Sequence, residues 1–143
     1  MVVREVIEVA RPPAEAFAYV ADFTTAAEWD PGIAASRRLS GEGGVGTRYE
    51  VFARFRGKEL PFAYTVTELV EGRRIVLEGV GTRALSRDTI EVERSGEGSR
   101  ISYTADIRMR GAYRLAEPFL RGTFRSLGAQ ALAGLKKALD RST

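Results

Sequence analysis

The feature that most constrains this chain is a change of hydrophobic period near residue 110. Between residues 47 and 109, apolar and polar residues alternate along several short runs that are separated by glycine-containing turns. After this point, apolar residues recur every three or four positions. Alternation at period two is typical of strands with one covered face, and the later spacing is typical of an amphipathic helix. The sequence therefore predicts an α+β fold in which six or seven antiparallel strands precede one long helix.

The long helix is expected over residues 117–141. At about 100° per residue, its apolar side chains fall within about 140° of arc, which provides one face for packing against the sheet. That face includes Leu120, Phe124 and Leu127. Because Leu115 and Phe119 lie off this face, we expect a bend or a new helix start near Pro118.

The N-terminal part of the chain predicts one strand followed by two short helices. Pro12 and Pro13 lack the N–H groups that a strand ladder needs, but proline is tolerated in the first turn of a helix. An apolar face at spacing i, i+3, i+4 then marks the first helix, at Phe17, Val20 and Ala21. The second short helix is expected over residues 24–29, with Thr24 or Thr25 as its cap.

The composition excludes several kinds of chemistry. The 143 residues include no cysteine and no histidine, so thiolate nucleophiles, serine–histidine triads and the usual zinc sites are ruled out. We expect no metal and no cofactor. The net charge of +3 is spread along the chain without a basic patch, so nucleic-acid binding is not expected. The length predicts one domain over residues 1–143, and the absence of a signal-like or membrane-spanning run predicts a soluble, cytoplasmic protein without stable membrane insertion.

The sequence GEGGVG at residues 41–46 matches the dinucleotide-binding pattern G-x-G-x-x-G. That pattern binds pyrophosphate only where the loop opens a helix. Here an alternating, strand-like run follows the loop. A hairpin loop is therefore favoured over a nucleotide site.

Four polar residues fall in inward phases of the predicted strands. Tyr49, Tyr64 and Tyr103 lie on three different strands, and their hydroxyls could orient a ligand or satisfy one another as core residues. Asp88 shares its phase with the apolar residues that follow it, where a carboxyl group is costly unless it is satisfied. Asp88 is therefore either a polar anchor or general base with a raised pKa, or a strand-start carboxylate paired near the rim.

A curved sheet around one helix leaves space between them, so the predicted fold implies a ligand cavity of roughly 300–1,000 Å³. Trp29 precedes a turn at Asp30-Pro31-Gly32, and its indole could wall this cavity or pack under the corner of the sheet. The residues that we expect to line the cavity are Trp29, Tyr49, Tyr64, Asp88, Tyr103, Leu120, Phe124 and Leu127.

Several stretches follow one another in a familiar order: RPPAEAFAYVAD from residue 11, EWDPGI from residue 28, GVGTRYEVFARF from residue 44 and SRDTIEVE from residue 86. With them, essentially the whole chain resembles the bacterial polyketide cyclase/dehydrase and lipid-transport proteins of the START-like (SRPBCC) superfamily. The resemblance implies the helix-grip fold, in which a curved antiparallel sheet of six to seven strands wraps around a long C-terminal helix. Two short helices follow the first strand of that fold.

Three functions remain open from the sequence. The first is binding of a small hydrophobic ligand (lipid-, polyketide- or aromatic-like) between sheet and helix. The second is a cofactor-free cyclase or dehydratase that uses Asp88 and an inward tyrosine. The third is a protein-partner module that resembles chaperone cofactors. A cavity-lining Asp88 with a second polar group in reach would favour the enzyme, whereas a filled interior with an exposed apolar patch would favour the partner module.

Overall fold

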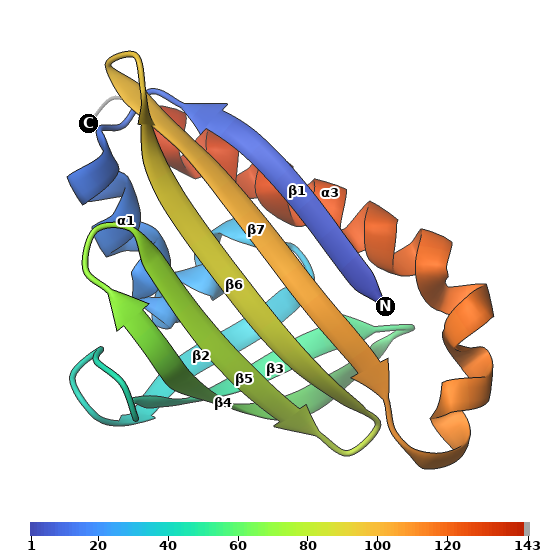
Figure 1. Cartoon of the computed structure of the whole chain (residues 1–143). Coiled ribbons are helices and arrows are strands. Elements are labelled where there is room, and N and C mark those ends of the chain that lie inside the picture. The colour runs from blue at the N-terminus through green and yellow to red at the C-terminus, as the bar shows by residue number, and fades with distance from the viewer. Residues whose placement is uncertain (142–143) are drawn as a thin grey trace.

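The computed structural model describes residues 1–141, which form one seven-stranded antiparallel sheet, three α-helices and two 3₁₀-helices (Figure 1). The strands are β1 (Val2–Val9), β2 (Ile33–Ser40), β3 (Arg48–Phe55), β4 (Lys58–Val70), β5 (Arg74–Gly81), β6 (Ala84–Ser95) and β7 (Gly98–Met109). The helices are α1 (Pro13–Ala21), η1 (Phe23–Thr25), α2 (Ala26–Trp29), η2 (Gly111–Ala116) and α3 (Glu117–Asp140).

The strand order is β1-β7-β6-β5-β4-β3-β2. Strands β2 to β7 form a meander of hairpins, and β1 adds to its end beside β7. The GEGGVG segment is the link between the neighbouring strands β2 and β3, which confirms the hairpin-loop interpretation. The predicted helix-grip architecture is confirmed: the curved sheet encloses an inner face, and α3 runs beside β1 along that face (Figure 1).

The core lies between the inner face of the sheet and the helices. The phase predicted for the strands is observed most clearly in β6, where Asp88, Ile90 and Val92 are buried and their neighbours are not. Tyr49 with Val51 on β3 and Tyr64 with Val66 on β4 follow it, whereas β5 has three buried residues in succession. Leu77 and Ile90 from the sheet meet Phe17 of α1 and Leu135 of α3 in this core, and all four are fully buried. Each such side chain contributes about 1.5–3 kcal/mol of transfer free energy to folding.

The predicted second short helix is observed as η1 followed by α2, and Thr25, one of the two predicted caps, is the N-cap residue of α2, although its side chain makes no capping hydrogen bond. The cap of η1 was not predicted: the Asp22 carboxylate accepts the backbone N–H of Thr24 at 3.1 Å. The Thr25 hydroxyl is occupied elsewhere, because it donates to the carbonyl oxygens of Tyr19 and Asp22 at 2.9 Å each. This arrangement fixes η1 and α2 beneath the end of the sheet.

A new helix start near Pro118 is confirmed. The 3₁₀-helix η2 ends at Ala116, and α3 begins at Glu117 with Pro118 in its first turn, where the missing N–H costs nothing. Within residues 1–141, neither α3 nor any other helix combines the length and the apolar character needed to span a bilayer.

Two glycines of α3 mark its closest approaches to the rest of the fold. A Cβ at Gly134 would lie 1.9 Å from the carbonyl oxygen of Trp29, and a Cβ at Gly128 would lie 2.8 Å from Cγ1 of Val3. Gly122, by contrast, has no neighbouring atom within 4 Å of such a Cβ. The backbone of α3 therefore packs directly against α2 and β1. This close packing sets how far α3 lies from the sheet.

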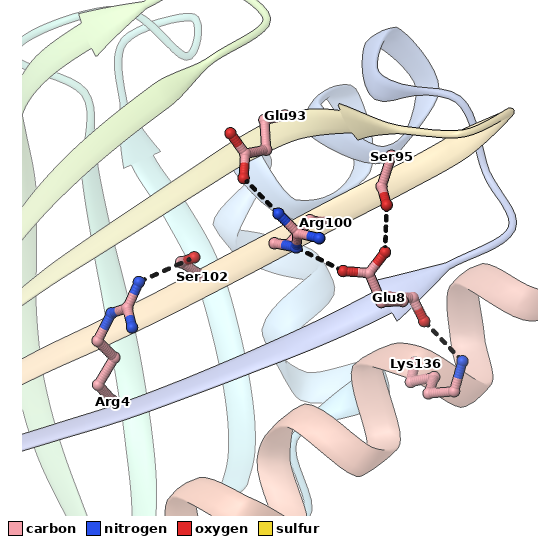
Figure 2. Close-up of polar contacts among 7 residues, drawn as sticks. All are labelled: Arg4, Glu8, Glu93, Ser95, Arg100, Ser102 and Lys136. Atoms are coloured by element: carbon pink, nitrogen blue, oxygen red, sulfur yellow. Dashed lines mark hydrogen bonds and ion pairs between the residues drawn. The ribbon is translucent and has the colours of Figure 1, made fainter.

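Polar contacts on the solvent side hold β1 between β7 and α3 (Figure 2). The Glu8 carboxylate accepts hydrogen bonds from Ser95 and from Arg100, the latter at 2.6 Å, and Arg100 also donates to Glu93 at 3.2 Å. Lys136 of α3 donates to the backbone oxygen of Glu8 at 2.6 Å. Exposed pairs of this kind contribute little to stability, so the backbone pairing with β7 and the packing of α3 do most to position β1.

Candidate functional site

A cavity of about 420 Å³ lies between the inner face of the sheet and helices α2 and α3. This volume is within the range of small-molecule sites. Most of the lining is apolar and includes Phe23, Val51, Phe62, Ala105, Ile107 and Leu132. Polar side chains gather at the wall formed by β4, β6 and β7 near the end of α2, and Glu5, Arg54, Thr82 and Arg83 line other parts of the cavity.

Asp88 is the centre of this polar region. Its side chain is 5% exposed; one carboxylate oxygen accepts a hydrogen bond from the Ser86 hydroxyl at 2.5 Å, and the other accepts one from the Tyr103 hydroxyl. Ser86 and Asp88 share a face of β6 because they are two residues apart, and Tyr103 reaches them diagonally from β7, where its direct partner is Ile90. Burial raises the pKa of Asp88, although both hydrogen bonds oppose the shift.

Tyr64 reaches the same region across β5, at a position where the residue on β5 is a glycine. Tyr64 on β4 pairs with Gly79 on β5, and Gly79 pairs with Ser86 on β6. A Cβ at Gly79 would lie 2.5 Å from the Tyr64 ring, so the ring occupies the place of a side chain on β5. Its hydroxyl thereby comes within hydrogen-bonding reach of Ser86, and burial raises the pKa of Tyr64 well above its ordinary value.

Asp30 adds a second carboxyl group to the cavity lining. It follows α2 directly, and its carboxylate accepts the backbone N–H of Gly32 at 2.7 Å. Burial raises the pKa of Asp30 to about 6, the negative charge of Asp88 adds to the shift, and the Gly32 hydrogen bond opposes it. In the described part of the chain, neither Asp30 nor Asp88 takes part in an ion pair. Both carboxyl groups therefore hold a proton more tightly than an exposed aspartate does.

Trp29 closes the cavity next to these carboxyl groups. The indole is buried, its Nε1–H donates to the Thr25 hydroxyl oxygen at 3.3 Å, and its ring meets the Tyr103 ring edge-on at 6.1 Å between centroids. It also lines the cavity. The two roles considered for Trp29 are compatible, because the indole packs under the corner of the sheet and forms a cavity wall with the same ring.

An aromatic stack joins the sheet to α3 at another part of the lining. The rings of Phe55, at the end of β3, and Phe124, on α3, are stacked with centroids 5.9 Å apart and planes 14° from parallel. Both side chains are half-buried. Since the stack bridges the β3–β4 hairpin and the helix, separating these two rings would widen the space between them.

The structure brings six of the eight expected lining residues to the cavity: Trp29, Tyr64, Asp88, Tyr103, Phe124 and Leu127. Tyr49 lies outside the lining, because its ring packs edge-on against Phe23 with centroids 5.9 Å apart and is buried in the core. Leu120 is buried on α3 but also lies outside the lining. Position on the inner face was therefore insufficient to place a side chain at the cavity.

Three residues of the polar region were not among those expected. Ser86 and Gly79 both lie in the inward phase of their strands. This phase is the sequence signal for both residues, because a serine or a glycine on an apolar face leaves room for a neighbour's polar group. The sequence predicts only a turn at Asp30. Its proximity to Asp88 depends on how α2 packs against the sheet, and the local sequence holds no signal for that packing.

Comparison with known proteins was made on sequence and on structure. The family described as polyketide cyclase/dehydrase and lipid transport matches residues 1–140. No curated protein matches the sequence.

Solved structures share the fold at low sequence identity. TTHA0849 from Thermus thermophilus superposes with a TM-score of 0.84 at 17% identity, and the match covers 97% of both chains. The Zhui aromatase/cyclase from Streptomyces sp. R1128 gives a TM-score of 0.85 at 15% identity over 99% of this chain and 94% of that one. A START superfamily protein from Mycobacterium smegmatis gives 0.75 at 18% identity, over 97% and 94%. These likenesses establish the shared fold.

Proposed function

The chain belongs to the polyketide cyclase/dehydrase and lipid transport family, and on this basis we propose that it binds a small, mainly apolar ligand with one polar group in the cavity above β4–β7. The observation that carries the proposal is the Asp88–Tyr103–Ser86 cluster in the wall of a mainly apolar cavity. The unfilled interior gives less support to a module that works only through its surface.

The polar region suits a ligand hydroxyl or carbonyl. A protonated Asp88 can donate a hydrogen bond to a carbonyl oxygen, and an ionised Asp88 can accept one from a hydroxyl. The tyrosine hydroxyls beside it stay protonated, because burial and the nearby carboxylate raise the pKa of Tyr103 well above its ordinary value. The apolar remainder of the ligand would contact the aromatic and aliphatic lining, which supplies most of the binding free energy.

Two measurements test ligand binding. Native mass spectrometry of the protein purified from its own host should show a co-purifying small molecule. Titration with the neutral fluorophore N-phenyl-1-naphthylamine should show saturable binding with one site per chain. Ala105→Phe, which fills the cavity, should abolish the binding, and Ala18→Phe, on the exposed side of α1, should not. Equal binding by both variants, or none by the unmodified protein, would overturn the proposal.

Cyclase or dehydratase activity is a second candidate. Asp88 lines the cavity with the Tyr103 hydroxyl in hydrogen-bonding reach, and Asp30 adds a second carboxyl group to the same lining. Both observations favour this activity. In a dehydration, the protonated Asp88 would give its proton to a departing hydroxyl group, which leaves as water. The Asp30 carboxylate would take the proton from the neighbouring carbon, whose C–H electrons form the new double bond. The Asp88 proton leaves in the water and Asp30 keeps the proton from the carbon, so exchange of both carboxyl groups with solvent resets the pair.

A model substrate can test this second function. 4-Hydroxy-4-phenylbutan-2-one loses water to give a conjugated enone that absorbs in the ultraviolet. An enzyme of this kind should accelerate that loss, and Asp88→Asn or Asp30→Asn should remove the acceleration while fluorophore binding persists. Glu97→Gln, in the exposed β6–β7 turn, serves as the control. Fluorophore binding without any acceleration would leave the ligand-binding function standing and reject the dehydratase.

A further inference from the structure

The hydroxyl protons around Asp88 are directed at acceptors within the same cluster. With Asp88 ionised, Ser86 and Tyr103 each donate to one of its carboxylate oxygens, Ser86 at 2.5 Å. The Tyr64 hydroxyl lies in reach of the Ser86 oxygen, which can accept its proton. The phenolic oxygens of both tyrosines keep lone pairs that can accept a hydrogen bond from a ligand. The cluster therefore offers acceptors to a ligand rather than donors.

Asp30 adds a second carboxylate to this part of the cavity. One of its oxygens accepts the backbone N–H of Gly32 at 2.7 Å, and within residues 1–141 no donor is hydrogen-bonded to the other oxygen. Burial raises the pKa of both phenols, Tyr64 and Tyr103, well above its ordinary value. The negative charges of Asp88 and Asp30 add to both shifts, so both carboxylates lie near the same two rings. A ligand group bound here would meet two carboxylates and hydroxyls whose protons are already donated.

The cationic side chains of the lining do not neutralise these carboxylates. Arg83 places its guanidinium over the ring of Tyr113 on η2, 5.3 Å from the ring centroid. Arg54 donates to the carbonyl oxygen of Pro31 at 3.1 Å. In the described chain neither arginine forms an ion pair, and neither does Glu5, which lines the cavity from β1. A cation brought by a ligand would therefore find carboxylates that the protein has not paired.

A protonated amine fits this arrangement better than the other polar groups that a ligand can carry. A carbonyl oxygen needs a donor, and a carboxylate would be repelled. A hydroxyl group donates one proton but is neutral. An ammonium group has three N–H donors and a positive charge, and a buried carboxylate is costly unless it is paired. Trp29, Tyr64 and Tyr103 also place aromatic rings at this end of the cavity, and the faces of such rings attract cations.

We propose that the ligand of this cavity carries a protonated amine, which binds to the carboxylates of Asp30 and Asp88 while the apolar part of the ligand fills the remaining space. This inference rests on the proposed ligand-binding function and names the polar group of the ligand. Binding of the cation favours the ionised form of both carboxyl groups. An ammonium group that keeps N–H donors fits better than a quaternary one, which has none.

Matched naphthalene derivatives test the proposal by displacing N-phenyl-1-naphthylamine, the neutral probe of the cavity. 1-Naphthylmethylamine should bind about ten-fold or more tightly than 1-naphthalenemethanol and 1-acetonaphthone. Its N,N,N-trimethyl derivative should lose most of this advantage, and 1-naphthoate should bind most weakly. Equal affinity of the amine and the alcohol would overturn the proposal, while displacement of the probe by both would preserve the ligand-binding function. Absence of probe binding would reject that function and the inference with it.

Variants identify the groups that recognise the amine. Asp30→Asn removes the charge and keeps an acceptor for Gly32. It should weaken the binding of 1-naphthylmethylamine about ten-fold or more and leave the affinity for 1-naphthalenemethanol within about two-fold. Asp88→Asn should act in the same direction, and Glu97→Gln, in the exposed β6–β7 turn, is the matched control. An equal loss for both compounds in Asp30→Asn would indicate a change of cavity shape and would overturn the proposal.

The pH dependence of binding is a separate readout. Burial raises the pKa of Asp30 to about 6, so Asp30 gains its charge between about pH 5 and about pH 7, where 1-naphthylmethylamine stays protonated. The affinity for the amine should rise over this range, the affinity for the alcohol should not, and Asp30→Asn should reduce the rise. Ionisation of Asp88 would act in the same direction, whereas the tyrosines of the lining stay neutral. The other titratable or charged side chains of the lining are Glu5 on β1, Arg54 on β3, Tyr64 on β4, Arg83 in the β5–β6 turn and Tyr103 on β7. An amine affinity that does not change with pH would contradict the role of Asp30.

Discussion

The ring of Tyr64 lies over Gly79 on the neighbouring strand, in the space where any other residue would place its side chain. The same relationship recurs one step along these strands, where the ring of Phe62 lies over Gly81. The two glycines therefore let aromatic rings from β4 spread across β5 toward β6. Without them, the Tyr64 hydroxyl would not reach the polar region around Asp88.

Gly79→Ala should displace the Tyr64 ring, because the new Cβ would lie 2.5 Å from it. We expect a loss of about 1–3 kcal/mol in the free energy of unfolding, the usual cost of overpacking. Urea denaturation would measure it. Gly44→Ala, in a loop where a Cβ meets no atom within 4 Å, is the control, and equal destabilisation by both variants would contradict the packing argument.

Two glycines of α3 should respond in opposite directions to replacement by alanine. Gly122→Ala should raise the stability by up to about 1 kcal/mol, because alanine favours the helix and meets no neighbour at this position. Gly134→Ala should lower it, because the new methyl group would overlap the carbonyl oxygen of Trp29. Thermal unfolding of both variants would measure the signs, and a stabilised Gly134→Ala protein would show that α3 is not seated on α2 as described.

Asp30→Asn should stabilise the protein in a pH-dependent way. The folded state raises the pKa of Asp30 from 3.8 to about 6, so the folded protein holds this proton more tightly than the unfolded chain does. The favourable contribution is complete below pH 3.8 and is lost as the pH rises through about 6.

At alkaline pH the ionised Asp30 should therefore cost at most about 3 kcal/mol, a cost that asparagine avoids while it still accepts the Gly32 N–H. Urea denaturation at about pH 8 and about pH 4 should show a gain at the higher pH that shrinks at the lower. Glu97→Gln provides the exposed control. A gain that does not change with pH would indicate that charge is not its cause.

Tyr103→Phe should weaken the fold most at high pH. The Tyr103 hydroxyl donates to the Asp88 carboxylate and thereby lowers the pKa of Asp88. Its removal leaves one oxygen of a buried carboxylate without this donor, which should cost about 1–3 kcal/mol where Asp88 is ionised. Because protonation of Asp88 relieves the cost, the effect should diminish as the pH falls. Tyr113→Phe, at an exposed tyrosine, should show neither the cost nor its pH dependence.

The fold could be predicted from the sequence because alternation and helical periodicity report directly which face of each element is covered. Thus the inward phases of Tyr64, Asp88 and Tyr103 were predicted, and so was the helix start near Pro118. The capping of η1 by Asp22 was missed, because several polar residues near a helix start compete for the same N–H groups and only the folded geometry selects one.

The candidate site was less predictable for a different reason. Tyr49 and Tyr64 have the same inward phase, but Phe23 covers Tyr49 while Gly79 leaves space for Tyr64. The approach of Asp30 to Asp88 likewise depends on the packing of α2 against the sheet. These contacts join segments distant in sequence, and periodicity within one segment carries no information about them.

The pairing of β1 with β7 also determines when the sheet can be completed during synthesis (Figure 1). The register places Val9 opposite Ser99 and Val2 opposite Asp106. Strand β1 therefore cannot pair with β7 until the whole meander has been synthesised. Non-local pairing of this kind slows folding. Residues of α3 close one side of the cavity, and α3 follows all seven strands in the chain, so until α3 has packed against β1 the apolar inner face of the sheet is exposed to solvent.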